Sequence, residues 1–112
     1  MATRYGVSYE GLPLGCPAYT LPAGRPDRLY HSADPEILAA PPALYREWEC
    51  GQGLYVVNPR NGRRLYVVRV DSCPGCGPNH IDLSEAGMAY LCGIEYPATC
   101  DYLAGLIVEE AW

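Results

Sequence analysis

The fold is decided by Val67-Val-Arg-Val-Asp-Ser-Cys-Pro-Gly-Cys76, which is soon followed by His80-Ile-Asp-Leu-Ser-Glu-Ala86. β-Branched and aromatic residues dominate positions 65–70, which predicts a strand there. Residues 72–79 are rich in Gly, Pro and Cys, and we expect a loop pinned by a disulfide. A second, brief strand is expected over 81–83. The segment therefore predicts two strands joined by a short loop that carries cysteines.

Helical signals are few in this chain. Ser84 is a preferred N-cap residue type, so we expect a helix over 85–91. Asp34, followed by Pro and Glu, predicts the start of another short helix. A third is expected over 42–48. The sequence therefore predicts two or three short helices.

The remaining segments have the pattern of short strands and turns. An opening strand is expected over 3–9, another over 54–57 and a closing one over 105–112. Residues 58–62 end in Asn-Gly, which is a strong hairpin signal. Residues 11–28 are dense in Gly and Pro and predict a loop. Short strands with a few helices fit a closed barrel in a mainly β domain.

Length, composition and charge limit what the chain can be. Its 112 residues make one domain, 1–112, and 49% hydrophobic with 19% charged residues is typical of a folded chain. Thirteen acidic and eight basic residues give a net charge of −5, which argues against nucleic acid as a partner. The longest apolar stretches, such as 103–108, are too short for a membrane span. Ten Tyr suit a polar ligand with flat faces.

Six cysteines in so short a chain indicate three disulfides formed in an oxidising compartment, and hence a secreted protein. They are Cys16, Cys50, Cys73, Cys76, Cys92 and Cys100. The residues alone leave the connectivity open. A zinc site from the last four is less favoured, because the second pair lacks the usual short spacing. A redox-active Cys-x-x-Cys is also less favoured, because Gly77 and Pro78 follow it and no helix starts there. No metal or cofactor is therefore expected.

Residues 54–93 carry several motifs in an order that matches the pattern of a known protein family. The chain resembles the six-stranded double-psi β-barrel shared by expansins, rare lipoprotein A, barwin-like proteins and family 45 endoglucanases. The motifs are Asn58, Asn61-Gly-Arg63, the two segments quoted above, Ala2-Thr-Arg-Tyr-Gly6 in the opening strand and Gly105-Leu-Ile-Val108 in the last. The resemblance implies a disulfide-stapled, six-stranded barrel over the whole chain, with Cys73–Cys76 as one bridge.

In this family a shallow groove crosses the barrel and holds a polysaccharide. Carried over to this chain, the resemblance implies a ligand-binding groove made by Thr3, Tyr5, Asp71, His80 and Asp82. The two aspartates are the candidate acids, since glycoside cleavage needs a carboxyl group that protonates the leaving oxygen. Each also has a structural alternative. Asp82 would bond amides near position 84, and Asp71 would bond amides in 72–76.

The chain departs from the family at the partners that those acids would need. The family 45 endoglucanases have an Asp just after Thr-x-Tyr in the first strand, where this chain has Gly6-Val-Ser8. Rare lipoprotein A has a His where this chain has Pro41 or Pro42. No catalytic residue is therefore assigned. The departures favour a protein that is not an enzyme and binds a glycan without hydrolysing it, as expansins do.

Three functions follow, in order of preference. The first is a secreted, expansin-like or rare lipoprotein A-like module that binds cell-wall polysaccharide, namely cellulose, chitin or peptidoglycan. The second is a protein-binding module of protease-inhibitor or self-associating type, with residues 11–42 as its loop surface. The third is a peptidoglycan lytic transglycosylase with Asp71 or Asp82 as the acid.

Overall fold

The structure, a computed structural model, describes residues 2–4, 9–21, 29–40, 49–73, 75–77 and 80–111. In chain order the elements there are β1 (Ala2–Arg4), η2 (Ala18–Thr20, a 3-10 turn), β2 (Ile37–Ala40), β3 (Gly53–Asn58), β4 (Arg63–Ser72), β5 (Ile81–Leu83), α1 (Glu85–Cys92), β6 (Tyr102–Leu103) and β7 (Ile107–Glu110). The prediction of a mainly β chain is confirmed. The described residues form seven strands and one α-helix, however, rather than six strands and two or three helices.

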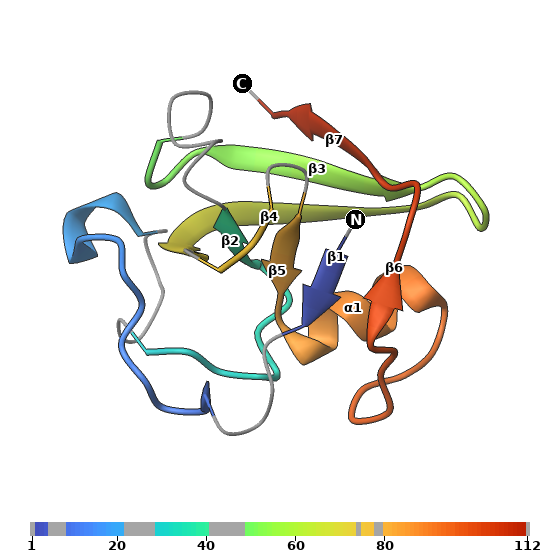
Figure 1. Cartoon of the computed structure of the whole chain (residues 1–112), viewed down its shortest axis with the longest axis horizontal. Helices are drawn as coiled ribbons and strands as arrows, with labels where there is room; N and C mark the ends of the chain where they lie inside the picture. Colours follow the sequence, from blue (N-terminus) through green and yellow to red (C-terminus); the bar gives the residue numbers. More distant parts are fainter. Residues whose placement is uncertain are drawn as a thin grey trace.

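All seven strands belong to one sheet in the order β6-β1-β5-β2-β4-β3-β7. β1 runs parallel to β5 and β2 runs parallel to β4, whereas the other neighbouring pairs are antiparallel. The sheet curls into a half-barrel, with α1 beside β1 and β6, and η2 at the opposite side of the molecule (Figure 1). Within the described strands, β6 and β7 are the ends of the strand order, and the curled sheet is consistent with the β-barrel that we expected.

The β3–β4 hairpin forms where the sequence predicts it. All six residues of β3 pair with β4, and Gly62 in the turn has φ of 75°, a left-handed conformation that glycine adopts without a steric penalty. The side chains of Asn58 and Asn61 each donate a hydrogen bond to the carbonyl of Leu91 at 2.8 Å. Because the last carbonyls of a helix lack intrahelical partners, the hairpin also completes the end of α1.

Helix α1 begins at the predicted N-cap. The Oγ atom of Ser84 accepts a hydrogen bond from the N–H of Gly87 at 3.0 Å, which satisfies one of the free donors of the first turn. Gly93 ends the helix with φ of 81°. Among the described residues, no helix has the length and apolar character needed to cross a bilayer.

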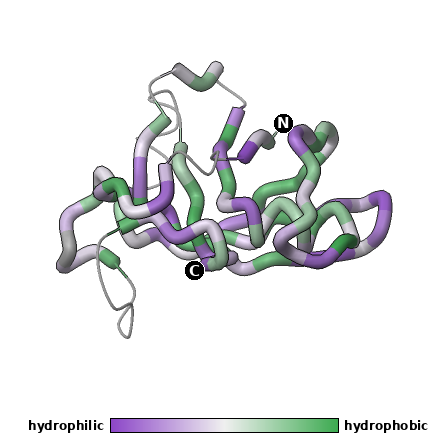
Figure 2. The backbone as a smooth tube through the Cα atoms, turned by 90° about the horizontal axis from the view of Figure 1, so that it is seen from below, coloured by the Kyte–Doolittle hydropathy of each residue, from purple (hydrophilic) through white to green (hydrophobic). Residues whose placement is uncertain are grey.

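Two core clusters lie on opposite faces of the central strands. The first core cluster contains α1 residues and consists of Ala2, Leu38, Ala40, Leu54, Val56, Leu65, Val67, Ile81, Leu83, Met88 and Leu91. The second core cluster consists of Leu14, Tyr30, Ile37, Ala39, Val68 and Val70. β2 contributes alternate residues to both clusters, so this strand is buried on both faces. In Figure 2 the turn at the far end of the β3–β4 hairpin is hydrophilic, and hydrophobic stretches lie toward the middle of the fold.

The helix predicted from Asp34 does not form. The Oδ1 atom of Asp34 accepts a hydrogen bond from the N–H of Glu36 at 3.0 Å, which makes a turn, and the chain then enters β2. The four residues at 37–40 are all apolar and all buried, so packing on two faces outweighs the N-cap signal. The helix predicted over 42–48 lies outside the described residues.

The terminal strands are shorter than predicted. β1 ends at Arg4, residues 5–8 lie outside the described part of the chain, and Tyr9 is in a turn. The closing strand predicted over 105–112 is the shorter β7, and β6, which pairs with β1, precedes it. Gly105 between them has φ of 73°, so the chain turns there at a residue suited to that conformation.

The six cysteines form three disulfides, which confirms that interpretation of the sequence. They are Cys16–Cys50, Cys73–Cys76 and Cys92–Cys100, with sequence separations of 34, 3 and 8. The expected Cys73–Cys76 bridge is therefore present. The long bridge joins the segment before η2 to the segment before β3, and the last one joins the end of α1 to the segment before β6.

The Cys16–Cys50 bridge should stabilise the fold more than Cys73–Cys76, because it closes a much longer loop of the unfolded chain. The chain-entropy relation gives about 4 kcal/mol for the long loop and about 2 kcal/mol for the short one. We expect the double variant Cys16→Ser/Cys50→Ser to lose more unfolding free energy than Cys73→Ser/Cys76→Ser. Urea unfolding of both variants without reductant measures the two losses. Equal losses would contradict the prediction.

Candidate functional site

A row of paired residues crosses four strands at the candidate site. Ala39 in β2 pairs with Asp71 in β4 and with Asp82 in β5, and Asp82 also pairs with Thr3 in β1. We call Asp71, Ala39, Asp82 and Thr3 the site row. Each aspartate is one strand away from Ala39, so their Cα atoms are about 10 Å apart, or two strand spacings. The row therefore places one carboxylate on each side of the small Ala39 side chain.

A β-bulge sets the register of the site row. Leu38 pairs with Arg69, but the next residue, Ala39, pairs with Asp71 and skips Val70. The extra residue changes the direction of the side chains at the end of β4. Without this bulge, Asp71 would not be aligned with Ala39 and Asp82.

Asp71 and Asp82 of the site row line a cavity of about 410 Å³. It is lined by Tyr9, Leu12, Pro13, Tyr30, Asp71, Ser72, Cys73, Gly75 and Asp82. Tyr30 is almost completely buried, at 1% exposed, whereas Tyr9 and Leu12 are 50% and 48% exposed. The cavity thus combines a buried ring, two carboxylates and an accessible apolar rim, and its volume lies in the range of small-ligand sites.

Asp82 is held by side chains on the candidate site face. The Oγ1 atom of Thr3 donates a hydrogen bond to Asp82 Oδ1, and the same hydroxyl bonds the Nε2 atom of His80. That ring nitrogen is 3.8 Å from Asp82 Oδ1, and Cys73 Sγ is 3.6 Å from Asp82 Oδ2. These side-chain contacts differ from the structural alternative, in which Asp82 would bond amides near Ser84.

Asp71 acts as an anchor for two backbone segments. Its Oδ1 atom accepts hydrogen bonds from the N–H groups of Gly15 and Ser72, both at 2.8 Å. A Cβ atom at position 15 would lie 2.5 Å from this oxygen, so the contact requires glycine there. The anchoring alternative for Asp71 therefore describes its contact with the Ser72 amide correctly. The structure adds a second amide partner, Gly15, which we did not expect from the sequence.

Residues 9–13 form the cavity rim turn, which Glu10 ties to the segment 30–32. Glu10 Oε1 accepts a hydrogen bond from the N–H of Ser32 at 2.9 Å, and Oε2 is 3.1 Å from His31 Nδ1. Two backbone bonds, Gly11 N–H to Tyr30 and Tyr30 N–H to Leu12, complete the join. The backbone hydrogen bond from Ser32 is the main reason that the pKa of Glu10 is lowered from its ordinary value of 4.5.

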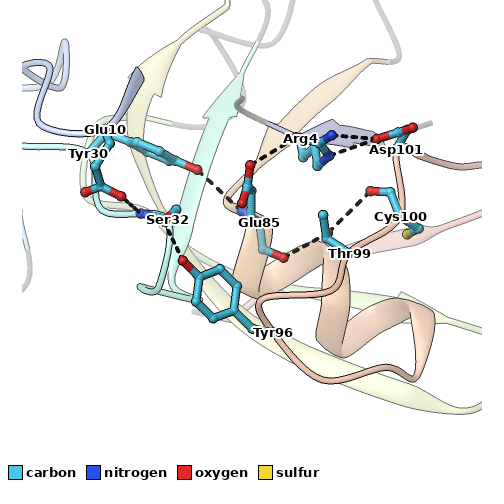
Figure 3. Close-up of polar contacts among 9 residues, drawn as sticks. All are labelled: Arg4, Glu10, Tyr30, Ser32, Glu85, Tyr96, Thr99, Cys100 and Asp101. Atoms are coloured by element: carbon cyan, nitrogen blue, oxygen red, sulfur yellow. Dashed lines mark hydrogen bonds and ion pairs between the residues drawn. The ribbon is translucent and has the colours of Figure 1, made fainter. Parts of the chain in front are cut away.

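A polar network behind the cavity connects Tyr30 to α1 (Figure 3). The Tyr30 hydroxyl accepts from the N–H of Glu85 at 3.4 Å, and burial raises the pKa of Tyr30 above its ordinary value. Glu85 is itself buried, and its carboxylate lies 3.0 Å from the Arg4 guanidinium, which also pairs with Asp101 at 2.7 Å. The network fixes the buried ring of the cavity to the start of the helix.

The structure brings together some of the residues implied by the resemblance. Thr3, His80 and Asp82 are in mutual contact, and Asp71 lies across Ala39 on the same cavity. Tyr5 lies outside the described residues. Sequence reasoning missed Tyr9, Leu12, Tyr30 and Glu10, because they lie in a Gly- and Pro-rich region without a periodic pattern. The high Tyr content was a signal for the two tyrosines, and residues 11–42 were considered only as a loop surface for a protein partner.

The same site contains one group of potential metal ligands in the described residues. The sulfur atoms of Cys73 and Cys76 and a carboxylate oxygen of Asp82 lie within 4.8 Å of one another. The two sulfurs are joined as a disulfide, and a metal binds thiolates. In its oxidised form the site is therefore suited to a ligand that accepts or donates hydrogen bonds and packs against Tyr.

Comparisons with known proteins give fold matches. No family model matches the chain, and no curated protein matches its sequence. The solution structure of the fungal elicitor cerato-platanin matches with a TM-score of 0.58 at 14% identity, covering 98% of this chain and 90% of the other. A Streptomyces papain inhibitor matches with a TM-score of 0.55 at 26% identity, covering 80% and 74%. Both have folds of the double-psi β-barrel type, which agrees with the type of fold implied by the resemblance.

The contact between Glu10 and Ser32 should make the free energy of unfolding depend on pH in the acidic range. The pKa of Glu10 is lower in the folded state than its ordinary value of 4.5. The stability that the ionised carboxylate contributes is therefore complete above pH 4.5 and is lost as the pH falls through the folded-state pKa. We expect Glu10→Gln to lose less than about 1 kcal/mol near neutral pH, since solvent screens this exposed group. Urea unfolding should show that wild type and Glu10→Gln converge at acidic pH.

Glu109→Gln is the matched control for this experiment, because Glu109 is exposed on β7, away from the rim turn. A stability difference between wild type and Glu10→Gln that does not change with pH would contradict the role assigned to the Glu10 carboxylate.

Proposed function

We propose that the chain is a secreted, expansin-like or rare lipoprotein A-like barrel that binds polysaccharide through the site row without hydrolysing it. The observation that carries the proposal is the position of Asp82. This carboxylate is half-buried, lines the cavity and is oriented by Thr3 and His80. Such a group accepts hydrogen bonds from sugar hydroxyls, and a charged acceptor makes stronger hydrogen bonds than a neutral one.

The aromatic part of the cavity complements this chemistry. A sugar ring has an apolar C–H face as well as hydroxyl groups, and Tyr combines a flat apolar ring with a polar hydroxyl. Tyr9 is half exposed and lines the same cavity as Asp82, together with the apolar Leu12. A chain of sugars would therefore place one face on the rim and its hydroxyl groups toward the carboxylate. Cellulose, chitin and peptidoglycan all contain such rings.

We expect no hydrolysis because the second catalytic group that the reaction needs is missing. Cleavage uses one carboxyl group as acid and another as base or nucleophile. Asp71 already uses Oδ1 to hold two backbone amides, and the sequence has no carboxylate at residues 6–8, where the family 45 endoglucanases have their second one. An acid alone contributes about 10²–10⁴-fold, far below the roughly 10⁶-fold or more of an enzyme.

A location outside the cytoplasm is part of the proposal. Three disulfides join all six cysteines, and such bonds persist in oxidising compartments.

The glycan proposal predicts retention on an insoluble polysaccharide that depends on Asp82. In pull-downs on cellulose, chitin and peptidoglycan, wild type should be retained on at least one of them. Asp82→Asn should reduce retention by about tenfold, the effect of losing a charge-assisted hydrogen bond, with unchanged thermal stability. The matched control Glu109→Gln should be retained like wild type. No soluble sugar should be released.

Each alternative has its own outcome in these assays. Sugar release that is lost in Asp82→Asn would favour the lytic enzyme. Equal retention of wild type and Asp82→Asn, with a loss of stability in the variant, would make Asp82 a structural residue. Failure to bind any of the three glycans would leave the protein-binding function as the better proposal.

A protein-binding function is the second candidate, and the η2 turn favours it. Tyr19 is 89% exposed on a short turn that is fixed on both sides. Cys16 is bridged to Cys50, and the N–H and hydroxyl of Thr20 both bond the carbonyl of Pro17. Exposed Tyr on a rigid support is a common anchor of protein interfaces. The similar papain inhibitor of Streptomyces suggests a papain-like protease as the first partner to test.

The second candidate predicts that Tyr19 contributes to inhibition of papain. In a peptide-hydrolysis assay, wild type should inhibit papain, and Tyr19→Ala should weaken inhibition by about 30-fold, as expected for an anchor residue. Tyr102→Ala is the control, because Tyr102 is also exposed but lies on β6. An absence of inhibition by wild type, or equal effects of the two variants, would reject this candidate.

A further inference from the structure

The Cys73–Cys76 disulfide lies beside the Asp82 carboxylate, and neither proposed function uses its sulfur atoms. Cys73 Sγ is 3.6 Å from Asp82 Oδ2, and the three potential ligand atoms lie within 4.8 Å of one another. Cys73 and Asp82 also line the cavity, and all three residues are half-buried. The group is therefore accessible from the cavity but partly shielded from solvent.

The distance between the Cys73 sulfur and the Asp82 carboxylate is that of two ligands in a zinc site. In a tetrahedral site, Zn–S bonds of about 2.3 Å and Zn–O bonds of about 2.1 Å place sulfur and oxygen ligands roughly 3.6 Å apart. This is the separation between Cys73 Sγ and Asp82 Oδ2. Cys-x-x-Cys is also a spacing with which two cysteines bind one zinc ion. Two thiolates on one tetrahedral zinc ion are about 3.8 Å apart, so the two sulfurs must separate once the sulfur–sulfur bond opens, while the Asp82 oxygen is already at its distance from Cys73.

The two oxygens of Asp82 are used in different directions. Oδ1 accepts the hydrogen bond from Thr3 and lies 3.8 Å from His80 Nε2, whereas Oδ2 is the oxygen near Cys73. Hydrogen bonds to the far oxygen of a carboxylate ligand orient it toward a metal. Thr3 and His80 therefore hold Asp82 in the orientation that a metal between Oδ2 and the sulfurs requires.

We propose that two-electron reduction of Cys73–Cys76 creates a Zn²⁺ site, with the two thiolates and the Asp82 carboxylate as ligands. The reductant is a dithiol. It supplies two electrons and two protons as the protein disulfide breaks, and it closes its own disulfide. Zinc binding then releases the two protons from the protein thiols to solvent. The fourth zinc position takes a water molecule or an oxygen of a ligand in the cavity.

Of the three disulfides, we expect Cys73–Cys76 to be reduced with the smallest loss of stability. Its separation of 3 residues closes a shorter loop than Cys92–Cys100 at 8 or Cys16–Cys50 at 34, so opening it releases the least chain entropy of the three. Cys16 is only 1% exposed, whereas Cys73 borders the cavity. Zinc binds the two thiolates and not the disulfide, so zinc binding stabilises the reduced form by mass action.

The test is metal binding by the full chain before and after mild reduction. A water-soluble phosphine, which takes an oxygen atom from water as it is oxidised, is added until alkylation and mass measurement show two free thiols. Peptide mapping should place both at Cys73 and Cys76. Native mass spectrometry should then find one Zn²⁺ per reduced chain and none per oxidised chain. Co²⁺ as a probe should give the thiolate-to-metal absorption of a sulfur-ligated site.

Variants distinguish this site from binding by cysteines in general. Asp82→Asn should weaken zinc affinity at least tenfold, whereas Glu109→Gln should not change it. Cys73→Ser/Cys76→Ser should abolish binding, and Cys92→Ser/Cys100→Ser should retain it. The proposal fails if another disulfide opens first, if the reduced wild type takes up no zinc, or if Asp82→Asn binds zinc as tightly as wild type. Binding to glycan is measured on the oxidised protein, so its result is independent of this one.

Discussion

Strand β2 is buried on both faces, and the arrangement of the other elements depends on this constraint. Leu38 and Ala40 belong to the first core cluster, and Ile37 and Ala39 belong to the second. The strand pairs in parallel with β4 and antiparallel with β5, so it joins the hairpin to the part of the sheet that contains β1. A strand of four apolar residues has no stable exposed face, and only a position between two packed layers satisfies it. The bulge in its pairing with β4 then decides which residue of β4 reaches the site.

The two aspartates of the site row have different surroundings, and this difference separates their roles. Asp71 receives two backbone N–H groups through one oxygen and therefore fixes the end of β4 to the segment at Gly15. Asp82 is bounded by the side chains of Thr3, His80 and Cys73. A carboxylate that holds backbone segments cannot be moved without loss of structure, whereas one held by side chains on a cavity wall can take part in binding. For this reason the glycan experiments are centred on Asp82.

Two of the three proposed activities share one residue, and the third uses a different part of the molecule. Glycan binding relies on the cavity rim turn and Asp82, protein binding relies on Tyr19 in η2, and zinc binding relies on the Cys73–Cys76 bridge in its reduced form. The zinc site and the glycan site share Asp82, so reduction and metal uptake would occupy the carboxylate that the sugar needs. Under these proposals the disulfide would couple the redox state of the surroundings to the chemistry of the cavity, whereas Tyr19 takes part in neither site.

The sequence by itself determined the local elements: the β3–β4 hairpin from Asn61-Gly62, α1 from Ser84, and the pairing of Cys73 with Cys76 through the family resemblance. Turn, cap and short-spacing signals act between residues that are close in the chain, so a linear pattern contains them. Only the tertiary structure decided that 37–40 is a strand and that Asp71 is aligned with Asp82. It also placed Tyr9, Glu10 and Tyr30 at the cavity. These features depend on burial and register between segments far apart in the chain, and the free energy of such contacts has no local signature in the sequence.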